Sequence, residues 1–288
     1  MVGCGDRERP FDAERAFRDL EAQVAMGPRV PGTEGHARTF EFLRTRAESL
    51  ADRVDVHRFE FTSPIDSSVA ECRNLVAVFQ PENSTRILFG AHWDTRPIAD
   101  AETDPELRNQ PVPGANDGAS GAALLLEVAA ALHAVPPRVG VDLVWFDAED
   151  SGVHEDVTTF AQGSARFVAD HPGYRPLAVV IFDMIGRRDL RILQEEISIT
   201  HAGGLVRSIW QIGRELGLTS LVDSVGPPVY DDHVAFLRAG IPAVDLIDFS
   251  DPVWHTTRDV PEHCSPASLD EMGRLALGIV RRAEESTP

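Results

Sequence analysis

Stretches of apolar residues with the length of buried β-strands alternate with stretches of helical spacing along most of this chain. The run at 139–146 is typical of a strand in a parallel sheet that is covered on both faces. Further strands are expected at 54–61, 74–79, 86–91, 177–182, 190–193 and 242–247. Helices are expected at 10–25, 35–51, 118–133, 163–170, 203–216, 231–240 and 266–285. This order predicts an α/β fold with three layers, α/β/α.

The domain organisation follows from the spacing of these elements. No linker is long enough to divide the chain, so residues 10–288 are predicted to form a single domain. Residues 1–9 are predicted to be a disordered N-terminal tail. The stretch 96–116 is rich in Pro, Asp and Asn and is predicted to be a long surface loop, which in a compact domain is usually functional or disordered.

Carboxylates and histidines follow nearly every predicted strand. In open α/β sheets the ligand site lies beyond the carboxyl ends of the strands, so these side chains should meet there. In chain order they are His92 and Asp94, Asp117 at the start of a helix, Glu149 and Asp150, Asp183, and His255.

Such a group of acids is costly to bury unless a cation neutralises it. Oxygen and imidazole ligands without a thiolate suit zinc in an open, catalytic site. Taken alone, Asp117 is more typical of a helix cap and His255 of an ordinary loop histidine. The coincidence at five strand exits favours a metal site.

Composition excludes several classes of chemistry. All 27 basic side chains are arginine and the chain has no lysine, which excludes a Schiff-base lysine, a phosphate-loop lysine and a Ser–Lys dyad. A net charge of −19 argues against a nucleic-acid partner, which needs a basic surface. No apolar run approaches the roughly 20 residues of a membrane span.

Several ordered motifs resemble the zinc aminopeptidase and glutaminyl cyclase superfamily. They are His-x-Asp at 92–94, Asn-Asp-Gly-Ala-Ser-Gly at 116–121, Glu-Asp at 149–150, Asp-Met-Ile-Gly at 183–186 and His-Thr-x-x-Asp at 255–259. Other segments resemble its glutaminyl-peptide cyclotransferase branch: Arg-Val-Pro-Gly-Thr at 29–33, Phe-Asp-Ala-Glu-Asp at 146–150, the segment 230–242 and Val-Trp-His-Thr-Thr-Arg-Asp at 253–259. The stretches 91–97 and 114–121 are similar to bacterial members of that branch.

The resemblance implies a fold, a metal and a reaction. The fold would be one α/β domain around a twisted mixed, mostly parallel sheet. One zinc would be held by Asp117, Asp150 and His255, with Glu149 as general acid and base. Asp183 would share a hydrogen bond with the substrate or with Glu149. The reaction would convert the N-terminal glutamine of a peptide or protein to pyroglutamate, with release of ammonia.

The walls of the substrate pocket are less well defined by the resemblance. Vertebrate members usually have glutamate where this chain has Asp150, and they carry a Trp soon after it that is missing here. The candidates for apolar walls are Trp93, Phe160 and Trp254, each of which could instead be plain packing. Asp232 and His233 are expected near the site, with His233 either in the pocket or capping a helix. His92 and Asp94 are expected at a second metal or in the site wall.

Two other functions are compatible with the residues. A two-zinc aminopeptidase would use as ligands His92, Asp117, Asp150, Asp183 and His255, with Glu149 activating water. A catalytically inactive, peptidase-like binding module is the other alternative, although such modules typically lose ligands and every motif position here keeps a usable side chain.

The N-terminus and the wider biology give the remaining expectations. The start Met-Val-Gly-Cys-Gly is similar to the end of a bacterial lipoprotein signal, so Cys4 is either a lipid anchor or an ordinary exposed cysteine. We expect a bacterial, monomeric protein that acts in the periplasm or outside the cytoplasm. Its expected partners are peptide and protein N-termini bearing glutamine.

Overall fold

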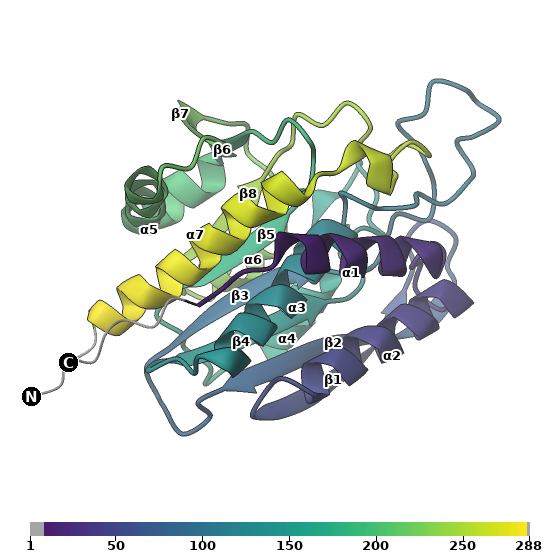
Figure 1. Ribbon diagram of the computed structural model, residues 1–288. Helices are drawn as coiled ribbons and strands as arrows, with labels where there is room; N and C mark the ends of the chain where they lie inside the picture. The colour runs from purple at the N-terminus through teal and green to yellow at the C-terminus, as the bar shows by residue number, and fades with distance from the viewer. Residues whose placement is uncertain (1–8, 287–288) are drawn as a thin grey trace, which may run out of the picture.

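The computed structural model describes residues 9–286 and places helices on both faces of a central six-stranded sheet (Figure 1). The strand order is β1-β2-β4-β3-β5-β8. The bounds are β1 Arg53–Thr62, β2 Val69–Phe79, β3 Arg86–His92, β4 Gly140–Phe146, β5 Val179–Asp183 and β8 Ala243–Ile247. Strands β4, β3, β5 and β8 run parallel, whereas β1 and β2 are antiparallel to their neighbours. The predicted mixed, mostly parallel sheet is therefore confirmed.

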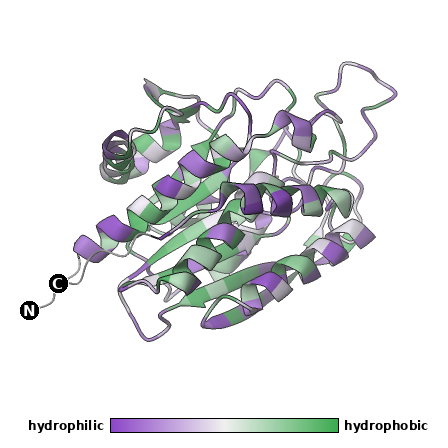
Figure 2. Cartoon of the chain, in the orientation of Figure 1, coloured by the Kyte–Doolittle hydropathy of each residue, from purple (hydrophilic) through white to green (hydrophobic). Residues whose placement is uncertain are grey.

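The helices divide between the two faces of the sheet. One face is covered by α1 Ala13–Ala25, α2 Glu34–Glu48, α3 Ala119–Ala134, α5 Glu196–Leu216 and α7 Pro266–Glu285. The other is covered by α4 Gln162–Asp170 and α6 His233–Arg238. Hydrophobic residues concentrate in the sheet and on the helix surfaces that face it, and hydrophilic residues lie outside (Figure 2). Strand β4 is buried along its whole length, as its apolar sequence predicts.

Helix α3 lies in the middle of the larger helical layer and packs against α1, α7 and β3. Nearly all of its residues are buried, which explains why its sequence is apolar on almost every face. Its first turn follows Gly118, whose φ of 92° lies in the left-handed region. A Cβ at this position would come within 2.6 Å of the Asp94 carbonyl oxygen, so glycine brings the start of α3 against the end of β3.

Three elements differ from the sequence prediction. Helix α5 begins at Glu196 rather than 203, because the Glu195 carboxylate caps it by accepting N–H groups of Ile197 and Ser198. The expected helix covers only the part beyond a kink at Ala202. Strand β2 begins at Val69, before the predicted start at 74, because its polar outer half pairs with β1.

The third difference is a small second sheet. Strand β6 (Ile192–Gln194), near the strand expected at 190–193, pairs in parallel with β7 (Leu221–Val225). The sequence analysis did not predict β7 or the separate sheet. Strand β7 is half-exposed and contains Asp223 and Ser224, so its sequence lacks the apolar signature of a buried strand.

Arg9 is the first residue that the structure describes, and its guanidinium lies 2.6 Å from the carboxylate of Glu284. Cys4 falls outside the described residues, and the two cysteines within them, Cys72 and Cys264, are buried free thiols. Between residues 9 and 286, no helix is long and apolar enough to cross a membrane.

Candidate active site

The carboxyl ends of the parallel strands bring three of the predicted ligands together. His255 Nε2 lies 3.0 Å from Asp150 Oδ1 and 3.8 Å from Asp117 Oδ2. One donor atom from each of these residues falls within a 4.8 Å cluster, and all three side chains are buried. Asp117 Oδ2 and Asp150 Oδ2 have no hydrogen-bond partner in the described part of the chain. Two orphaned carboxylate oxygens and an imidazole fit a divalent cation such as zinc.

A second group shares Asp117 with the first. His92 Nε2 lies 3.0 Å from Asp117 Oδ1 and 3.0 Å from Asp183 Oδ1. Burial opposes a charge on His92, but Asp183, Asp117 and Asp94 outweigh it and raise its pKa well above the usual value. His92, Asp117 and Asp183 therefore form a compact buried group, which could hold either a proton or a second metal ion.

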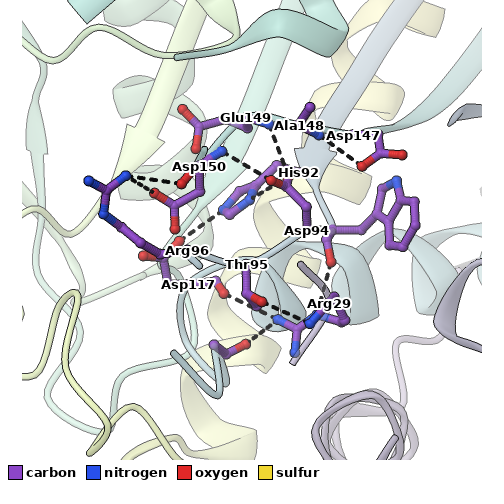
Figure 3. A network of polar contacts seen from close by, with 12 residues as sticks. Arg29, His92, Asp94, Thr95, Arg96, Asp117, Asp147, Ala148, Glu149 and Asp150 are labelled. Carbon is purple, nitrogen blue, oxygen red and sulfur yellow. Dashed lines mark hydrogen bonds and ion pairs between the residues drawn. The ribbon is translucent and has the colours of Figure 1, made fainter. Parts of the chain in front are cut away.

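Asp94 holds the backbone rather than facing the cavity. Its two carboxylate oxygens accept the N–H groups of Glu149 and Asp150 at 3.0 and 3.1 Å (Figure 3). It is completely buried, and it does not line the cavity or join a candidate metal cluster among residues 9–286. Asp94 was expected at a second metal or in the site wall; in the structure both of its oxygens fix the turn that carries Glu149 and Asp150.

That turn is held from the other side by Asp147. The Asp147 carboxylate accepts the N–H of Ala148 at 2.9 Å and lies 2.9 Å from His36 Nε2 (Figure 3 shows the turn). Ala148 has a φ of 55°, a left-handed conformation that is unfavourable for a residue with a Cβ. Met184, after Asp183, and His255 itself are also left-handed, with φ values of 50° and 54°. Three strained residues therefore lie at or beside the predicted site residues.

Glu149 is buried at the edge of the cavity. Burial raises its pKa well above the usual value, and Asp231, Asp150 and Asp232 add to this while His92 acts against it. A raised pKa makes this carboxyl group suited to act as a general acid and base. The main acidic neighbour is Asp231 and not Asp183, whose hydrogen-bond partner among the described residues is His92.

The cavity over these residues has a volume of about 190 Å³. Its lining includes Phe160 and Trp254, two of the three aromatic walls expected from the sequence, together with Phe249. The Trp254 ring stacks on His255 with centroids 3.7 Å apart and an interplanar angle of 23°. This ring covers the imidazole of a predicted ligand and closes one side of the cavity.

Trp93 does not line the cavity, so its predicted role as a pocket wall is wrong. It is completely buried and stacks on His36 with ring centroids 4.4 Å apart. Side chains alternate along a strand, so the residue between His92 and Asp94 points to the opposite side of the sheet.

Two adjacent acids, Asp231 and Asp232, precede α6, and the one that lines the cavity is Asp231 rather than the expected Asp232. Asp231 lines the cavity, and burial, with a contribution from Asp183, raises its pKa to about 7. Asp232 and His233 are completely buried and do not line the cavity. His233 Nε2 lies 3.3 Å from a carboxylate oxygen of Glu195, and no side-chain hydrogen bond caps the start of α6.

Two further residues organise the site, and the sequence analysis did not assign them roles. Asp259 accepts the N–H groups of Asn116 and Asp117 at 2.8 and 3.0 Å, so it fixes the backbone of one predicted ligand. Asp100 Oδ1 lies 3.2 Å from Nδ1 of His255. Asp259 ends the His-Thr-x-x-Asp motif, which could have signalled it, whereas nothing in the sequence of the loop at 96–116 singles out Asp100.

Arg29 connects two loops of the site through hydrogen bonds to their backbone carbonyl groups. Its side chain, labelled in Figure 3, is completely buried. It donates to carbonyl oxygens of Trp93 at 2.9 Å, Pro113 at 2.8 Å and Gly114 at 2.5 Å. A longer bond of 3.3 Å reaches the carbonyl of Asp117. The Arg-Val-Pro-Gly-Thr motif thus places one guanidinium where it joins the exit of β3 to the loop that precedes α3.

Comparison with known proteins gives consistent matches. The sequence profile of "Peptidase family M28" matches residues 74–280. The crystal structure of Tannerella forsythia glutaminyl cyclase superposes with a TM-score of 0.89 and 34% identity, over 94% of this chain and 98% of that one. A Zn-dependent exopeptidase from Parabacteroides distasonis superposes with a TM-score of 0.90 and 31% identity, over 95% and 99%. The glutaminyl-peptide cyclotransferase of Boiga irregularis is 25% identical, over 86% of this chain and 75% of that protein.

Proposed function

This chain belongs to peptidase family M28, and from that premise we propose that it is a zinc-dependent glutaminyl-peptide cyclotransferase. It converts the N-terminal glutamine of peptides and proteins to pyroglutamate and releases ammonia. The glutaminyl cyclases among its structural neighbours and the cyclotransferase among its sequence relatives support this activity. A monomeric state, a location outside the cytoplasm and a single domain stay predictions from the sequence.

The observation that carries the proposal is that an aromatic ring lies over His255, one of the three proposed zinc ligands. The Trp254 ring lies 3.7 Å from that of His255, and Phe249 lies 5.0 Å from Trp254 between ring centroids. Cyclisation needs the glutamine to fold back until its own amine reaches its side-chain carbonyl. A small cavity with apolar walls favours that compact conformer, and intramolecular attack then has a high effective molarity.

We infer one zinc ion, held by Asp117, Asp150 and His255. Zinc in this position would polarise the side-chain amide carbonyl of the substrate glutamine. This group of ligands contains two carboxylate oxygens without a hydrogen-bond partner among the described residues, Asp117 Oδ2 and Asp150 Oδ2, which supports placing the ion here.

Proton transfer is the role of Glu149. Its carboxylate accepts a proton from the substrate α-amine as the amine nitrogen forms a bond to the side-chain carbonyl carbon. The same carboxyl group then donates the proton to the side-chain nitrogen, and that carbon–nitrogen bond breaks to release ammonia. Asp183 and Asp231 both line the cavity and can accept hydrogen bonds from the amine before it reacts.

A two-zinc aminopeptidase is the second candidate. The cluster of His92, Asp117 and Asp183 favours it, because these residues offer a second ligand set within 4.8 Å. In that case Glu149 would activate a water molecule for hydrolysis.

One experiment separates the two activities. The zinc-loaded protein is incubated with a glutamine-initiated peptide and the product is analysed by mass spectrometry. Cyclisation removes only ammonia, a loss of about 17 Da, because the amide nitrogen is the leaving group. Loss of a whole residue, together with two tightly bound zinc ions, would replace the cyclase assignment by the aminopeptidase one. Absence of metal and of both products would instead favour a binding module.

A further inference from the structure

A second cavity of about 170 Å³ adjoins the first. The two share Val229, Ile247 and Phe249 as lining residues, so these side chains form a common wall between them. The second cavity is otherwise bordered by Leu193 of β6 and by Gly226, which directly follows β7; Figure 1 shows where these strands lie. A peptide whose first residue occupies the catalytic cavity therefore has the second cavity beside it.

The lining of the second cavity is mostly apolar. Leu193, Pro227, Val229, Ile247 and Phe249 line it, and Phe249 remains 42% exposed although it is a large hydrophobic residue. An exposed aromatic ring at the mouth of a cleft is typical of a binding surface. These walls suit an apolar side chain of the bound peptide.

The acids in this cavity are already satisfied by the protein. Glu195 accepts the N–H of Val229 at 3.0 Å in addition to its helix-capping bonds. Asp248 accepts the N–H of Arg191 at 3.1 Å and lies 3.3 Å from the guanidinium of Arg187. Both acids are almost completely buried, so neither offers a free charge to a ligand.

Arg191 is the other charged residue that lines the second cavity. Its side chain is exposed, and its guanidinium has no hydrogen bond or ion pair with any residue between 9 and 286. Within the described part of the chain it is the only basic residue except histidine that lines either cavity. The catalytic cavity, in contrast, is bordered by Asp117, Asp150, Asp183 and other acids. An unpaired guanidinium at the rim of an apolar cavity suits a carboxylate that follows an apolar side chain.

We propose that the second cavity is a substrate subsite that binds an apolar residue directly after the N-terminal glutamine, with Arg191 pairing with an acidic third residue. The proposal rests on the proposed cyclase activity for the identity of the first residue. It adds a sequence preference, glutamine–apolar–acidic, that the catalytic cavity alone does not impose.

Binding to the zinc-loaded Glu149→Gln variant tests the subsite without turnover. The probes are the peptide amides Gln-Leu-Glu, Gln-Leu-Gln and Gln-Gly-Gln, whose amide ends remove the terminal carboxylate. Isothermal titration should give a Kd about tenfold or more higher for Gln-Gly-Gln than for Gln-Leu-Gln, because a buried side chain is lost. Replacing Glu by Gln at the third position should raise Kd about two- to fivefold, as expected for an exposed ion pair.

Two substitutions in the same background locate the effect. Arg191→Gln should remove the preference for Glu, and Leu193→Ala should reduce the preference for Leu over Gly. The matched control is Arg166→Gln, an exposed arginine on α4 that lines neither cavity and should leave both preferences intact.

The outcomes for the subsite and for the enzyme are separable. Equal Kd values for the leucine and glycine peptides, or a Glu preference that survives Arg191→Gln, overturn the subsite. If the unsubstituted enzyme releases ammonia from all three peptides at equal kcat/KM and binding is also equal, the cyclase stands and the subsite falls. If binding discriminates between the peptides but none of them is cyclised, the subsite stands and the cyclase assignment falls.

Discussion

The carboxylate of Asp100 lies 3.2 Å from Nδ1 of His255, on the opposite side of the imidazole from Asp150. The same carboxylate is held by two guanidinium nitrogens of Arg96 at 3.0 and 2.6 Å. Burial alone would raise the pKa of Asp100, but His255 and Arg96 outweigh it and lower the pKa, so the group stays ionised. Asp100 thus orients His255 so that Nε2 points at the other two proposed ligands.

Asp100→Asn should therefore weaken zinc binding. Loss of a carboxylate behind a ligand histidine typically costs about 10- to 100-fold in metal affinity, because the ring is less well oriented and less basic. Competition with a chelating dye measures the zinc Kd. Asp104→Asn, an exposed acid on the same loop, is the control. An equal loss in both variants would mean that the loop, and not the contact with His255, determines affinity.

Glu149→Gln should abolish turnover and retain zinc. An amide cannot carry the proton from the amine to the leaving nitrogen, and this step typically contributes about 10²- to 10⁴-fold in rate. Ammonia release gives kcat, and metal analysis gives the zinc content. The control Glu155→Gln changes an exposed glutamate on the loop that follows Asp150 and should keep full activity. Full activity in Glu149→Gln would rule out Glu149 as the proton carrier.

Arg29→Met should lower the free energy of unfolding by at least about 3 kcal/mol, because several buried carbonyl groups lose their donor. Lysine should not rescue the loss, since one ammonium cannot span the carbonyls of Trp93, Pro113 and Gly114 as the guanidinium does. Urea unfolding measures the change. Arg18→Met on the exposed side of α1 is the control, and a similar change in both variants would exclude a special role for Arg29.

The zinc-free protein should lose stability as pH rises. Burial raises the pKa of Asp231 to about 7 and that of Asp259 to about 8, whereas an unfolded aspartate titrates near about 3.9. Between these values the folded chain binds protons that the unfolded chain has released, so the free energy of unfolding falls with rising pH. Burial lowers the pKa of His255, but nearby carboxylates outweigh it and raise this pKa to about 9. The stability that protonated His255 contributes to the folded chain is therefore lost as the pH rises toward that value.

Thermal unfolding between pH 5 and 9 measures this effect, and Tm of the zinc-free protein should drop by about 5 °C or more. Zinc replaces the bound protons, so the stabilisation by zinc should grow with pH. A Tm of the zinc-free protein that is constant or increases with pH would contradict the proton-binding site described above.

The sequence was sufficient to predict the sheet and that the side chains at the strand exits meet at one edge of it, because the chain returns to that edge each time. The choice of Asp117, Asp150 and His255 as one ligand set came from the family resemblance, and in the structure these three side chains lie together. The strand pattern could also have placed Trp93 correctly, because alternation directs it away from its neighbours His92 and Asp94.

Other parts of the site depend on irregular backbone that no periodicity describes. Asp231 and Asp232 are adjacent acids, and only the turn before α6 decides that Asp231 reaches the cavity. Asp100 approaches His255 from the long loop at 96–116, whose path is fixed by contacts such as the Arg96–Asp100 pair rather than by local propensity. Strand β7 was not predicted because it is largely exposed, and an exposed strand does not need the apolar residues that identify a buried strand in the sequence.

The left-handed backbone at Ala148, Met184 and His255 has a consequence for laboratory evolution of this protein. Each such residue costs roughly 1–3 kcal/mol, so a search for heat resistance finds easy gains at these positions, for example by Ala148→Gly. Glycine there would relax the turn that aims Glu149 and Asp150. Variants selected only for survival at high temperature should therefore accumulate losses of catalytic efficiency at these three positions, so a screen must impose both criteria at once.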